Sequence, residues 1–326
     1  MKILLTGASG FVGSHILDEL LARGYGVSIL LRPTASRRFL QRHLGSVVVR
    51  EGSISDPASL GKALEGVTHV IHCAGATRAA RSEDYYRTNH IGTRNVLEAI
   101  QAREGAIRRL IHVSSLAVSG PATAANPARE DSAARPISEY GKSKHAAEEE
   151  VRNRCQAEFV IVRPPAVYGP RDDGFFSLFQ AVQRHLLPLP SDTQELSLVY
   201  VKDLARAVAE LVTRPEASGQ TYFVSSSEVV TARRMAREIA SQTAHWTVPF
   251  PLAPVAFLPL CLANEMICRL FGRAQLLNLQ KYAELRAPGW VCDPSKLRRE
   301  TGLDCPTALK QGVAETLAWY RQEGWL

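Results

Sequence analysis

The chain has 326 residues, of which 45% are hydrophobic and 22% are charged, proportions typical of a folded globular protein. Its net charge of +7 comes with scattered arginines, which argues against nucleic-acid binding. None of its six cysteines forms a Cys-x-x-Cys pair or has the spacing to histidine of a zinc site, so we expect free thiols and no metal. A first strand that begins at Lys2, with no signal peptide before it, predicts a cytoplasmic protein.

The N-terminus carries a glycine-rich turn between a strand and a helix. The apolar run Ile3–Leu5 predicts a buried strand, and a helix is expected over 11–23. Glycines at 7, 10 and 13 would allow a tight turn, close approach of a phosphate and close packing of the helix on the sheet. The helix N-terminus would then direct its N–H groups at a pyrophosphate. The spacing is one residue longer than the Gly-x-Gly-x-x-Gly fingerprint.

Strands and helices alternate through the first half of the chain. This order predicts a parallel sheet with right-handed crossovers, an α/β Rossmann-type doubly wound fold. Residues 122–135 predict a loop over the site. The expected strands are 27–31, 46–50, 69–72, 109–113 and 159–162, and the expected helices are 35–43, 57–64, 81–102 and 139–153.

Helical patterns dominate after Arg163. We expect a dinucleotide-binding domain over 1–165 and a smaller, mostly helical substrate-binding region over 166–326, interleaved with the first. Its predicted helices are 175–184, 201–213, 232–242, 253–271 and 307–322, and its predicted strands lie near 197–200 and 221–224.

Tyr140 and Lys144 stand one helical turn apart, so both project from the same helix face. An unperturbed phenol titrates near pH 10, and an ammonium beside it would lower that pKa. The pair can therefore supply a general acid or base. The alternative is an ordinary solvated helix face.

Together with the glycine turn, these residues resemble the extended short-chain dehydrogenases/reductases, also called the NAD-dependent epimerase/dehydratase family. The resemblance covers nearly the whole chain and implies hydride transfer between a nicotinamide and a carbonyl or alcohol carbon. Further landmarks in the correct order are His72–Ala76, Asn89, Ser114-Ser115, Arg163–Pro170 and Val199–Leu204.

The resemblance implies four catalytic residues. Tyr140 would donate the proton, Lys144 would lower the pKa of Tyr140 and hold the nicotinamide ribose, and Ser115 would orient the substrate oxygen. Either serine of the pair fits the motif; alignment on Gly120 favours Ser115, and its alternative role is capping the strand end. Asn89 would support Lys144 through a water relay, or serve a structural role. The resemblance also implies a homodimer.

Cofactor choice depends on the end of the second strand. Leu31 takes the position where an acidic residue would bind the ribose of NAD, and Arg32 follows it. Because arginine suits bidentate phosphate contact, we favour NADP(H), with NAD(H) as the alternative. We expect at least two of the arginines 32, 37, 38 and 42 to be merely solvated. Ser53 replaces the family's adenine-binding aspartate, which weakens that contact.

The full set of expected cofactor contacts comes from the glycine turn, the ends of the strands and the catalytic helix. They are Gly7, Ser9, Gly10, Phe11, Val12, Gly13, Arg32, Arg37, Ser53, Ile54, Cys73, Ala74, Gly75, Ala76, Asn89, Val113, Tyr140, Lys144, Pro164, Ala166 and Val167.

At several motif positions this chain differs from related branches of the family, and these differences reduce the number of expected substrate classes. Dehydratases of the family carry Asp-Glu where this chain has Leu116-Ala117, and many epimerases carry Asn at the position of Pro165. Residues 196–198, Leu-Ser-Leu, offer no arginine for a sugar-nucleotide diphosphate. The remaining pattern resembles the 3β-hydroxysteroid dehydrogenase and dihydroflavonol reductase branch. We therefore expect an NADP(H)-dependent oxidoreductase that interconverts a ketone and a secondary alcohol on an apolar substrate. The alternatives are a nucleotide-sugar epimerase or dehydratase, and a non-catalytic dinucleotide-binding protein.

The stretch 247–271 is apolar and broken by prolines, so we do not expect it to span a membrane. We expect it to cover the nicotinamide end of the cleft, with an apolar pocket formed by Phe250, Leu252, Phe257, Leu258 and Leu260. The alternatives are a dimer interface, a weak contact with a membrane surface, or core packing.

Overall fold

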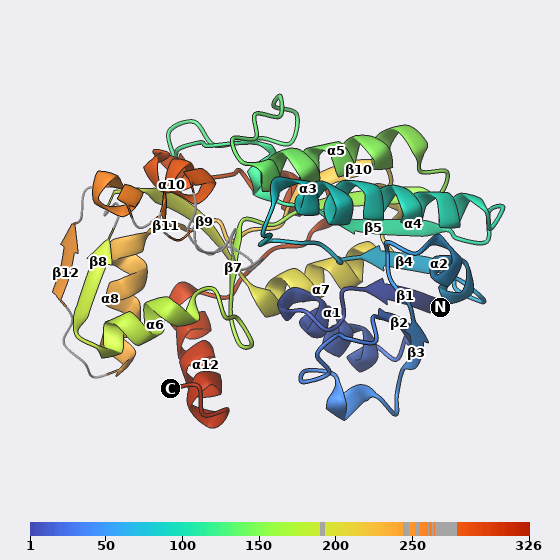
Figure 1. The fold of residues 1–326 in the computed structure, drawn as a ribbon, viewed down its shortest axis with the longest axis horizontal. Helices are drawn as coiled ribbons and strands as arrows, with labels where there is room; N and C mark the ends of the chain where they lie inside the picture. Colours follow the sequence, from blue (N-terminus) through green and yellow to red (C-terminus); the bar gives the residue numbers. More distant parts are fainter. Residues whose placement is uncertain (190–192, 244–247, 252–253, 260, 263, 265–278) are drawn as a thin grey trace.

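The computed structural model describes residues 1–189, 193–243, 248–251, 254–259, 261–262, 264 and 279–326 (Figure 1). The strands are β1 (Lys2–Thr6), β2 (Gly26–Leu31), β3 (Val48–Glu51), β4 (His69–His72), β5 (Arg109–Val113), β6 (Glu158–Arg163), β7 (Ala166–Tyr168), β8 (Leu186–Leu189), β9 (Glu195–Tyr200), β10 (Gln220–Phe223), β11 (Val229–Thr231), β12 (Val248–Pro251) and β13 (Gly289–Trp290). The helices are α1 (Phe11–Ala22), α2 (Pro57–Ala63), α3 (Ser82–Tyr85), α4 (Gly92–Gln101), α5 (Glu139–Arg154), α6 (Phe176–Gln183), α7 (Val201–Leu211), α8 (Ala232–Thr243), α10 (Leu279–Arg286), α11 (Ser295–Thr301) and α12 (Leu309–Gln322). A π-helix (Tyr86–Ile91) joins α3 to α4, and short 3₁₀ turns lie at Gln41–His43, Leu116–Val118, Pro215–Ala217 and Pro254–Phe257.

The main sheet has seven parallel strands in the order β10-β6-β5-β4-β1-β2-β3. The strand order reverses between β1 and β4, and ligands of doubly wound sheets bind at the carboxyl ends of the strands at such a point. The predicted Rossmann-type sheet is confirmed. Strand β10, from the second half of the chain, completes one edge.

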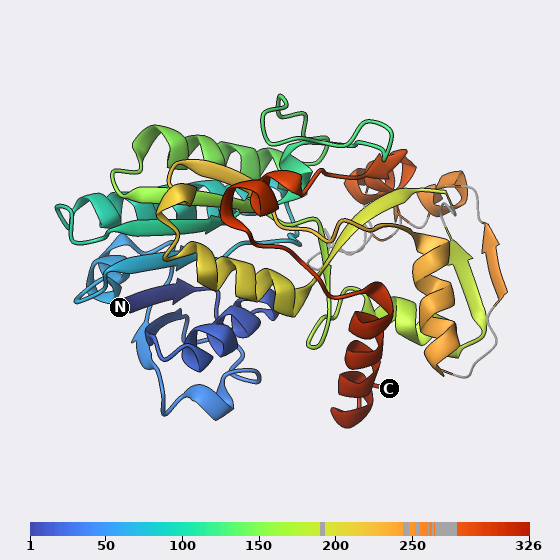
Figure 2. The same cartoon turned by 180° about the vertical axis from the view of Figure 1, so that it is seen from behind.

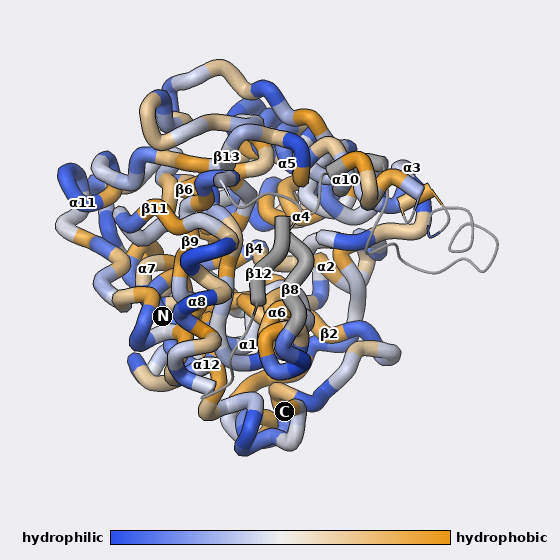
Figure 3. Tube along the Cα trace, turned by 90° about the vertical axis from the view of Figure 1, so that its left-hand side faces the viewer, coloured by the Kyte–Doolittle hydropathy of each residue, from blue (hydrophilic) through white to orange (hydrophobic). Residues whose placement is uncertain are grey.

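Two apolar layers hold this sheet between helices (Figures 1 and 2). Alternate residues of one strand face opposite sides, so Ile3 and Leu5 pack against α1 and α7 while Leu4 packs toward α2 and α4. All three side chains are fully buried, which stabilises the fold by roughly 1.5–3 kcal/mol each. Figure 3 shows apolar segments concentrated toward the middle of the molecule, with hydrophilic residues on outer loops and on α11.

The second half of the chain adds smaller sheets and an aromatic core. Strand β9 pairs with β7, β11 and β13, and β12 pairs with β8. Helices α6, α8 and α12 bury Phe179, Ile239 and Tyr320 beside this sheet. Glycine at 312 is required here, because a Cβ would stand 2.4 Å from the hydroxyl oxygen of Tyr168.

Two predicted helices were wrong in extent. The helix expected over 35–43 is a loop that ends in the 3₁₀ turn Gln41–His43, because Leu40 is drawn into the sheet core while Phe39 packs on Trp319. The helix expected over 81–102 is divided by the π-helix, whose wider turn buries Asn89. Helices α10 and α11, of eight and seven residues, were not predicted.

The apolar stretch 247–271 lies largely outside the described residues. Leu252 and Leu260 are among the undescribed positions, as are the side chains of Phe250 and Phe257. Within the described part, Leu258 is half-buried and Val255 is exposed. Its role as a lid therefore stays a prediction. Among the described residues, no helix is long and apolar enough to cross a membrane.

Arg109 links the main sheet to the end of α7. Its side chain is buried, and its guanidinium donates to the carbonyl oxygens of Leu211, Val212 and Arg214 as well as to the carboxylate of Glu158. The last carbonyls of a helix lack partners within that helix, so this arginine supplies a cap.

We predict that Arg109→Leu lowers the free energy of unfolding by about 2–3 kcal/mol, because buried carbonyl groups lose a charged donor. Arg108→Leu is the matched control, since its side chain is exposed, and it should change stability by less than about 0.5 kcal/mol. Urea denaturation measures both. Equal effects would show that the cap contributes nothing specific.

Candidate active site

The glycine turn after β1 brings the backbone of α1 close to the strand. Gly7 has φ +78°, and a Cβ there would stand 2.7 Å from the nitrogen of Ala74. A Cβ on Gly13 would stand 2.1 Å from the carbonyl oxygen of Gly7, so only glycine fits either position. Helix α1 has no side-chain cap at its N-terminus. Its first N–H groups are suited to bind an anion, as expected for a pyrophosphate.

Asn89 holds the segment after β4 against α5. Its amide oxygen accepts a hydrogen bond from the Ala76 nitrogen at 2.7 Å, and its amide nitrogen donates to the Ala76 carbonyl and to the Ser143 hydroxyl. These bonds use both amide hydrogens. These contacts fit the structural role that we expected for Asn89, and its water-mediated support of Lys144 stays a prediction.

His72 ties β1 and β4 to α4 below this segment. The Thr93 hydroxyl must donate to the Asn89 carbonyl, so it accepts from Nε2–H of His72 at 3.0 Å. Nδ1 of His72 then accepts from the Thr6 hydroxyl at 2.8 Å, and the oxygen of Thr6 accepts from the Ala74 nitrogen. Burial lowers the pKa of His72 to about 3, which keeps the ring neutral.

The two adjacent serines after β5 have different partners. The buried Ser114 hydroxyl donates to the carboxylate of Glu148 at 2.5 Å. Ser115 accepts from the Ala117 nitrogen at 3.1 Å, which caps the 3₁₀ turn, and donates to the phenol oxygen of Tyr140. Ser115 is therefore the serine that contacts Tyr140, whereas Ser114 contacts the buried carboxylate of Glu148.

Gly141 allows the contact between Ser115 and Tyr140, and the sequence analysis did not identify this glycine as part of the site. A Cβ there would stand 2.6 Å from the Ala117 carbonyl, so a glycine is needed for α5 to approach the turn that carries Ser115. Its position inside the Tyr-x-x-x-Lys motif was the available signal.

Burial has the largest effect on the pKa of Tyr140, and the lowering that we expected from Lys144 stays a prediction. Nζ of Lys144 donates to the carbonyl of Val113 at 2.7 Å. Burial raises the pKa of Tyr140 to about 12, against the opposing hydrogen bond from Ser115, and the Glu284 charge raises it further. Burial also lowers the pKa of Lys144 to about 8. At neutral pH the phenol therefore keeps its proton.

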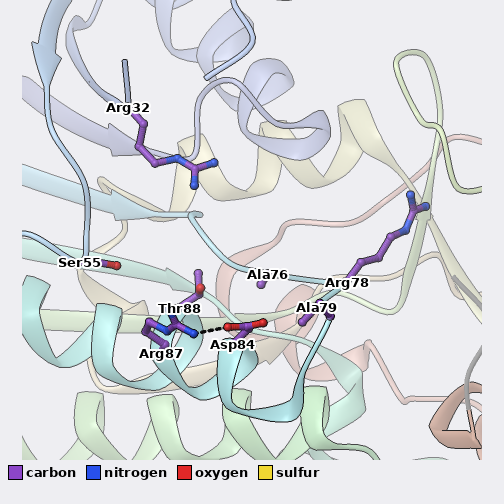
Figure 4. Close-up of a pocket in the computed structure, with 9 residues that line it drawn as sticks. Arg32, Ser55, Ala76, Arg78, Ala79, Asp84, Arg87 and Thr88 are labelled. Atoms are coloured by element: carbon purple, nitrogen blue, oxygen red, sulfur yellow. Dashed lines mark hydrogen bonds and ion pairs between the residues drawn. The ribbon is translucent and has the colours of Figure 1, made fainter. Parts of the chain in front are cut away.

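A pocket of about 430 Å³ opens between Arg32, just after β2, and the segment after β4 (Figure 4). Arg32 and Arg87 lie on opposite sides of it. Of the residues we predicted, Arg32 and Ala76 line this pocket. Those that sequence reasoning missed come from loops and from the π-helix region, and include Ser55, Arg78, Asp84, Arg87 and Thr88. No motif marked them.

Two of the four arginines considered for the cofactor phosphate contact other protein groups instead. Arg38 lies over the Trp325 ring, and Arg42 donates to Asp18 at 2.7 Å. Arg32 and Arg37 are exposed, and neither has an acidic partner in the part of the chain that the structure describes.

The remaining predicted contacts lie around the same strand ends. Ser53 accepts from the Ser55 nitrogen, and its hydroxyl hydrogen can still donate. Ile54 is buried, and its carbonyl accepts from Asn95. Pro164 accepts from the Leu116 nitrogen, which places the turn after β6 beside Ser115. Ala166 and Val167 begin β7, and Cys73 is half-buried at the end of β4.

The described chain contains no cluster of three or more His, Cys, Asp or Glu side chains able to hold a metal ion. The residues that are present do fit a dinucleotide, since the close approach of α1 to the glycine turn leaves the first N–H groups of this helix without a side-chain cap and able to bind a pyrophosphate.

Comparison with known proteins agrees with this geometry. Residues 3–225 match the model of the NAD-dependent epimerase/dehydratase family. The chain is 31% identical to a ceramide reductase of Caulobacter vibrioides, covering 99% of this chain and 96% of that one. It is 28% identical to a UDP-glucose 4-epimerase of Vibrio cholerae, covering 98% and 96%. The structure of Thermus thermophilus UDP-glucose 4-epimerase in complex with NAD superposes with a TM-score of 0.77 at 25% identity, covering 98% and 99%. The chain therefore belongs to the NAD-dependent epimerase/dehydratase family and is an NAD(P)-dependent enzyme of the extended short-chain dehydrogenase/reductase type.

Proposed function

We propose that this protein is an NADP(H)-dependent oxidoreductase that interconverts a ketone and a secondary alcohol on an apolar substrate. The observation that carries the chemistry is the Ser115–Tyr140 hydrogen bond on the first turn of α5, with Lys144 one turn further along. The bound nicotinamide would supply or accept the hydride. The chain itself must bind, orient and protonate the substrate oxygen.

Tyr140 would act as the general acid in the reductive direction. Its raised pKa keeps the phenol protonated at neutral pH, so a proton is available for the developing alkoxide. The resulting phenolate would accept the hydrogen bond that Ser115 already donates. Ser115 can donate this bond while its oxygen accepts from the Ala117 nitrogen. Lys144, one helical turn away, would favour the phenolate in its charged form, which is the pKa-lowering role that we predicted for it.

Two features support an apolar ketone over a sugar nucleotide. The positions where an epimerase would offer a diphosphate-binding arginine belong to β9, and there Ser197 and Leu198 are buried. Ser197 accepts from the Cys292 nitrogen at 3.1 Å, so this position serves sheet packing. A ceramide reductase also aligns over nearly the full length of both chains. Similarity to UDP-glucose 4-epimerases supports the second candidate, nucleotide-sugar epimerisation.

The two candidates differ in what happens to the cofactor. A panel of long-chain and sterol ketones should oxidise NADPH and yield one alcohol each, read by absorbance and by mass spectrometry of the product. UDP-glucose and UDP-galactose should bind weakly, because a diphosphate without a cationic partner is poorly held. Micromolar binding of either sugar nucleotide, together with its epimerisation and no turnover of ketones, would replace our proposal with the second candidate.

Tyr140→Phe should lower kcat by at least about a hundredfold, since the general acid is lost while ring packing against Tyr85 is kept. The dissociation constant of the cofactor should change by less than about twofold. Steady-state kinetics and fluorescence titration measure the two quantities. A variant that retains more than about a tenth of wild-type kcat would remove Tyr140 from this role.

Arg32→Ala should weaken NADPH binding by about 1.5–3 kcal/mol, because the 2′-phosphate loses a charged partner. Binding of NADH should barely change, since it lacks that phosphate, and NADH therefore serves as the internal control. Calorimetric titration of both cofactors measures the difference. Equal losses for both would show that Arg32 does not recognise the phosphate.

A further inference from the structure

The loop that carries Arg32 and Arg37 lacks regular structure of its own. Residues 32–40 are held locally by only a few bonds, such as Ala35 nitrogen to Arg32 carbonyl and Leu40 nitrogen to Arg37 carbonyl. An arginine on such a loop binds a phosphate well only if the loop is already ordered, because ordering it on binding would cost affinity. What fixes the loop therefore bears on which cofactor the protein prefers.

One side of the loop is held by the C-terminal end of the chain. The Arg38 guanidinium lies 4.9 Å from the centroid of the Trp325 ring, and it is 3.8 Å from the Glu323 carboxylate. The Phe39 ring meets the edge of Trp319 with 6.2 Å between centroids. Figure 1 shows α12 and the segment between β2 and β3 on the same side of the molecule.

Trp325 is itself fixed by the core of the second half of the chain. Its ring stacks on Tyr320 at 5.5 Å with an interplanar angle of 13°, and it meets Phe176 and Trp319 edge-on. The backbone nitrogen of Trp325 donates to the Tyr320 carbonyl at 2.8 Å. The Tyr320 hydroxyl in turn donates to the carbonyl of Asp172, in the loop after β7. The tryptophan is therefore a rigid surface against which Arg38 can rest.

The other side of the loop is held through Asp18 of α1. Its carboxylate accepts from Arg42 and contacts His43 at 2.6 Å, both just beyond the loop. Asp18 also accepts from the buried Arg171, whose guanidinium lies 5.6 Å from the Phe39 ring centroid. The C-terminal aromatic contacts and this polar contact together enclose residues 38–43.

We propose that Trp325 is a positioning residue for cofactor preference. By holding Arg38, it keeps the 32–40 loop in the conformation that presents Arg32 and Arg37 to the 2′-phosphate of NADPH. This inference rests on the proposed function, in which Arg32 binds that phosphate, and on the sequence-based expectation that Arg37 is a second contact. The region responsible for cofactor preference would thus depend on the last turn of the chain, some 290 residues from Arg32 in sequence.

The test compares Trp325→Ala, Trp325→Phe and the control Arg321→Ala, which removes an exposed side chain from the same end of α12. In Trp325→Ala the dissociation constant of NADPH should rise about fivefold to tenfold, the scale of losing a cation–π contact that orders a binding loop. That of NADH should stay within about twofold. Trp325→Phe, which keeps an aromatic face, should recover most of the NADPH affinity, and Arg321→Ala should resemble wild type.

Hydrogen exchange without cofactor gives an independent readout. Amides of residues 33–44 should exchange faster in Trp325→Ala than in wild type or in Arg321→Ala. The wild-type ratio of the two dissociation constants tests the proposed NADP(H) preference. The change of that ratio in Trp325→Ala tests the present inference, so the two can fail separately. An unchanged ratio, or equal weakening of both cofactors, would overturn the role of Trp325.

Discussion

The candidate site depends on one buried carboxylate, Glu148 of α5. Its side chain has no solvent exposure, and it binds Ser114 at the end of β5, Arg163 at the end of β6, and Arg152 on its own helix. Burial alone would raise its pKa, but the hydrogen bonds and charge of Arg163 outweigh this and lower it. A buried charge with these partners is costly to disrupt, roughly 3–5 kcal/mol when one partner is lost. The carboxylate therefore fixes the ends of two strands relative to the helix that carries Tyr140 and Lys144.

A second polar group, Asn89, connects this framework to the cofactor side. It joins Ser143, which neighbours Lys144 on α5, to the backbone of Ala76 after β4. His72 and Thr6 extend the same network to β1 and the glycine turn. Hydrogen bonds thus link the end of β1, just before the turn expected to bind pyrophosphate, through Thr93 and Asn89 to the helix expected to carry the chemistry. Because the groups of this network are buried and hydrogen-bonded, it would hold the proposed catalytic groups in place before any substrate enters.

The sequence predicted the elements with strong local signals and missed those set by tertiary packing. The glycine turn, the parallel strands and the catalytic helix follow from periodicity and from motifs that tolerate few alternatives. The loop over 35–40 could not be predicted in this way, since Phe39 packs against Trp319 while Leu40 packs into the core beside the main sheet. The burial that raises the pKa of Tyr140 was not predicted either, because spacing on a helix places Lys144 nearby but shows neither how deeply the phenol is buried nor that Nζ of Lys144 contacts Val113. Pocket residues such as Arg87 come from a π-helix, and no sequence motif predicts which of its residues face the pocket.

The central claim is a division of labour between two adjacent serines, in which Ser114 stabilises the framework and Ser115 takes part in the reaction. Ser114→Ala and Ser115→Ala remove the same atom one residue apart, so comparison of their kcat values and melting temperatures tests the claim directly. We expect Ser115→Ala to lower kcat by about tenfold or more while stability falls by no more than about 1 kcal/mol, the scale of losing the cap on Ala117. Ser114→Ala should cost about 1–3 kcal/mol of stability and leave kcat within about threefold of wild type. Equal losses of kcat in both variants, or the larger loss in Ser114→Ala, would contradict the account.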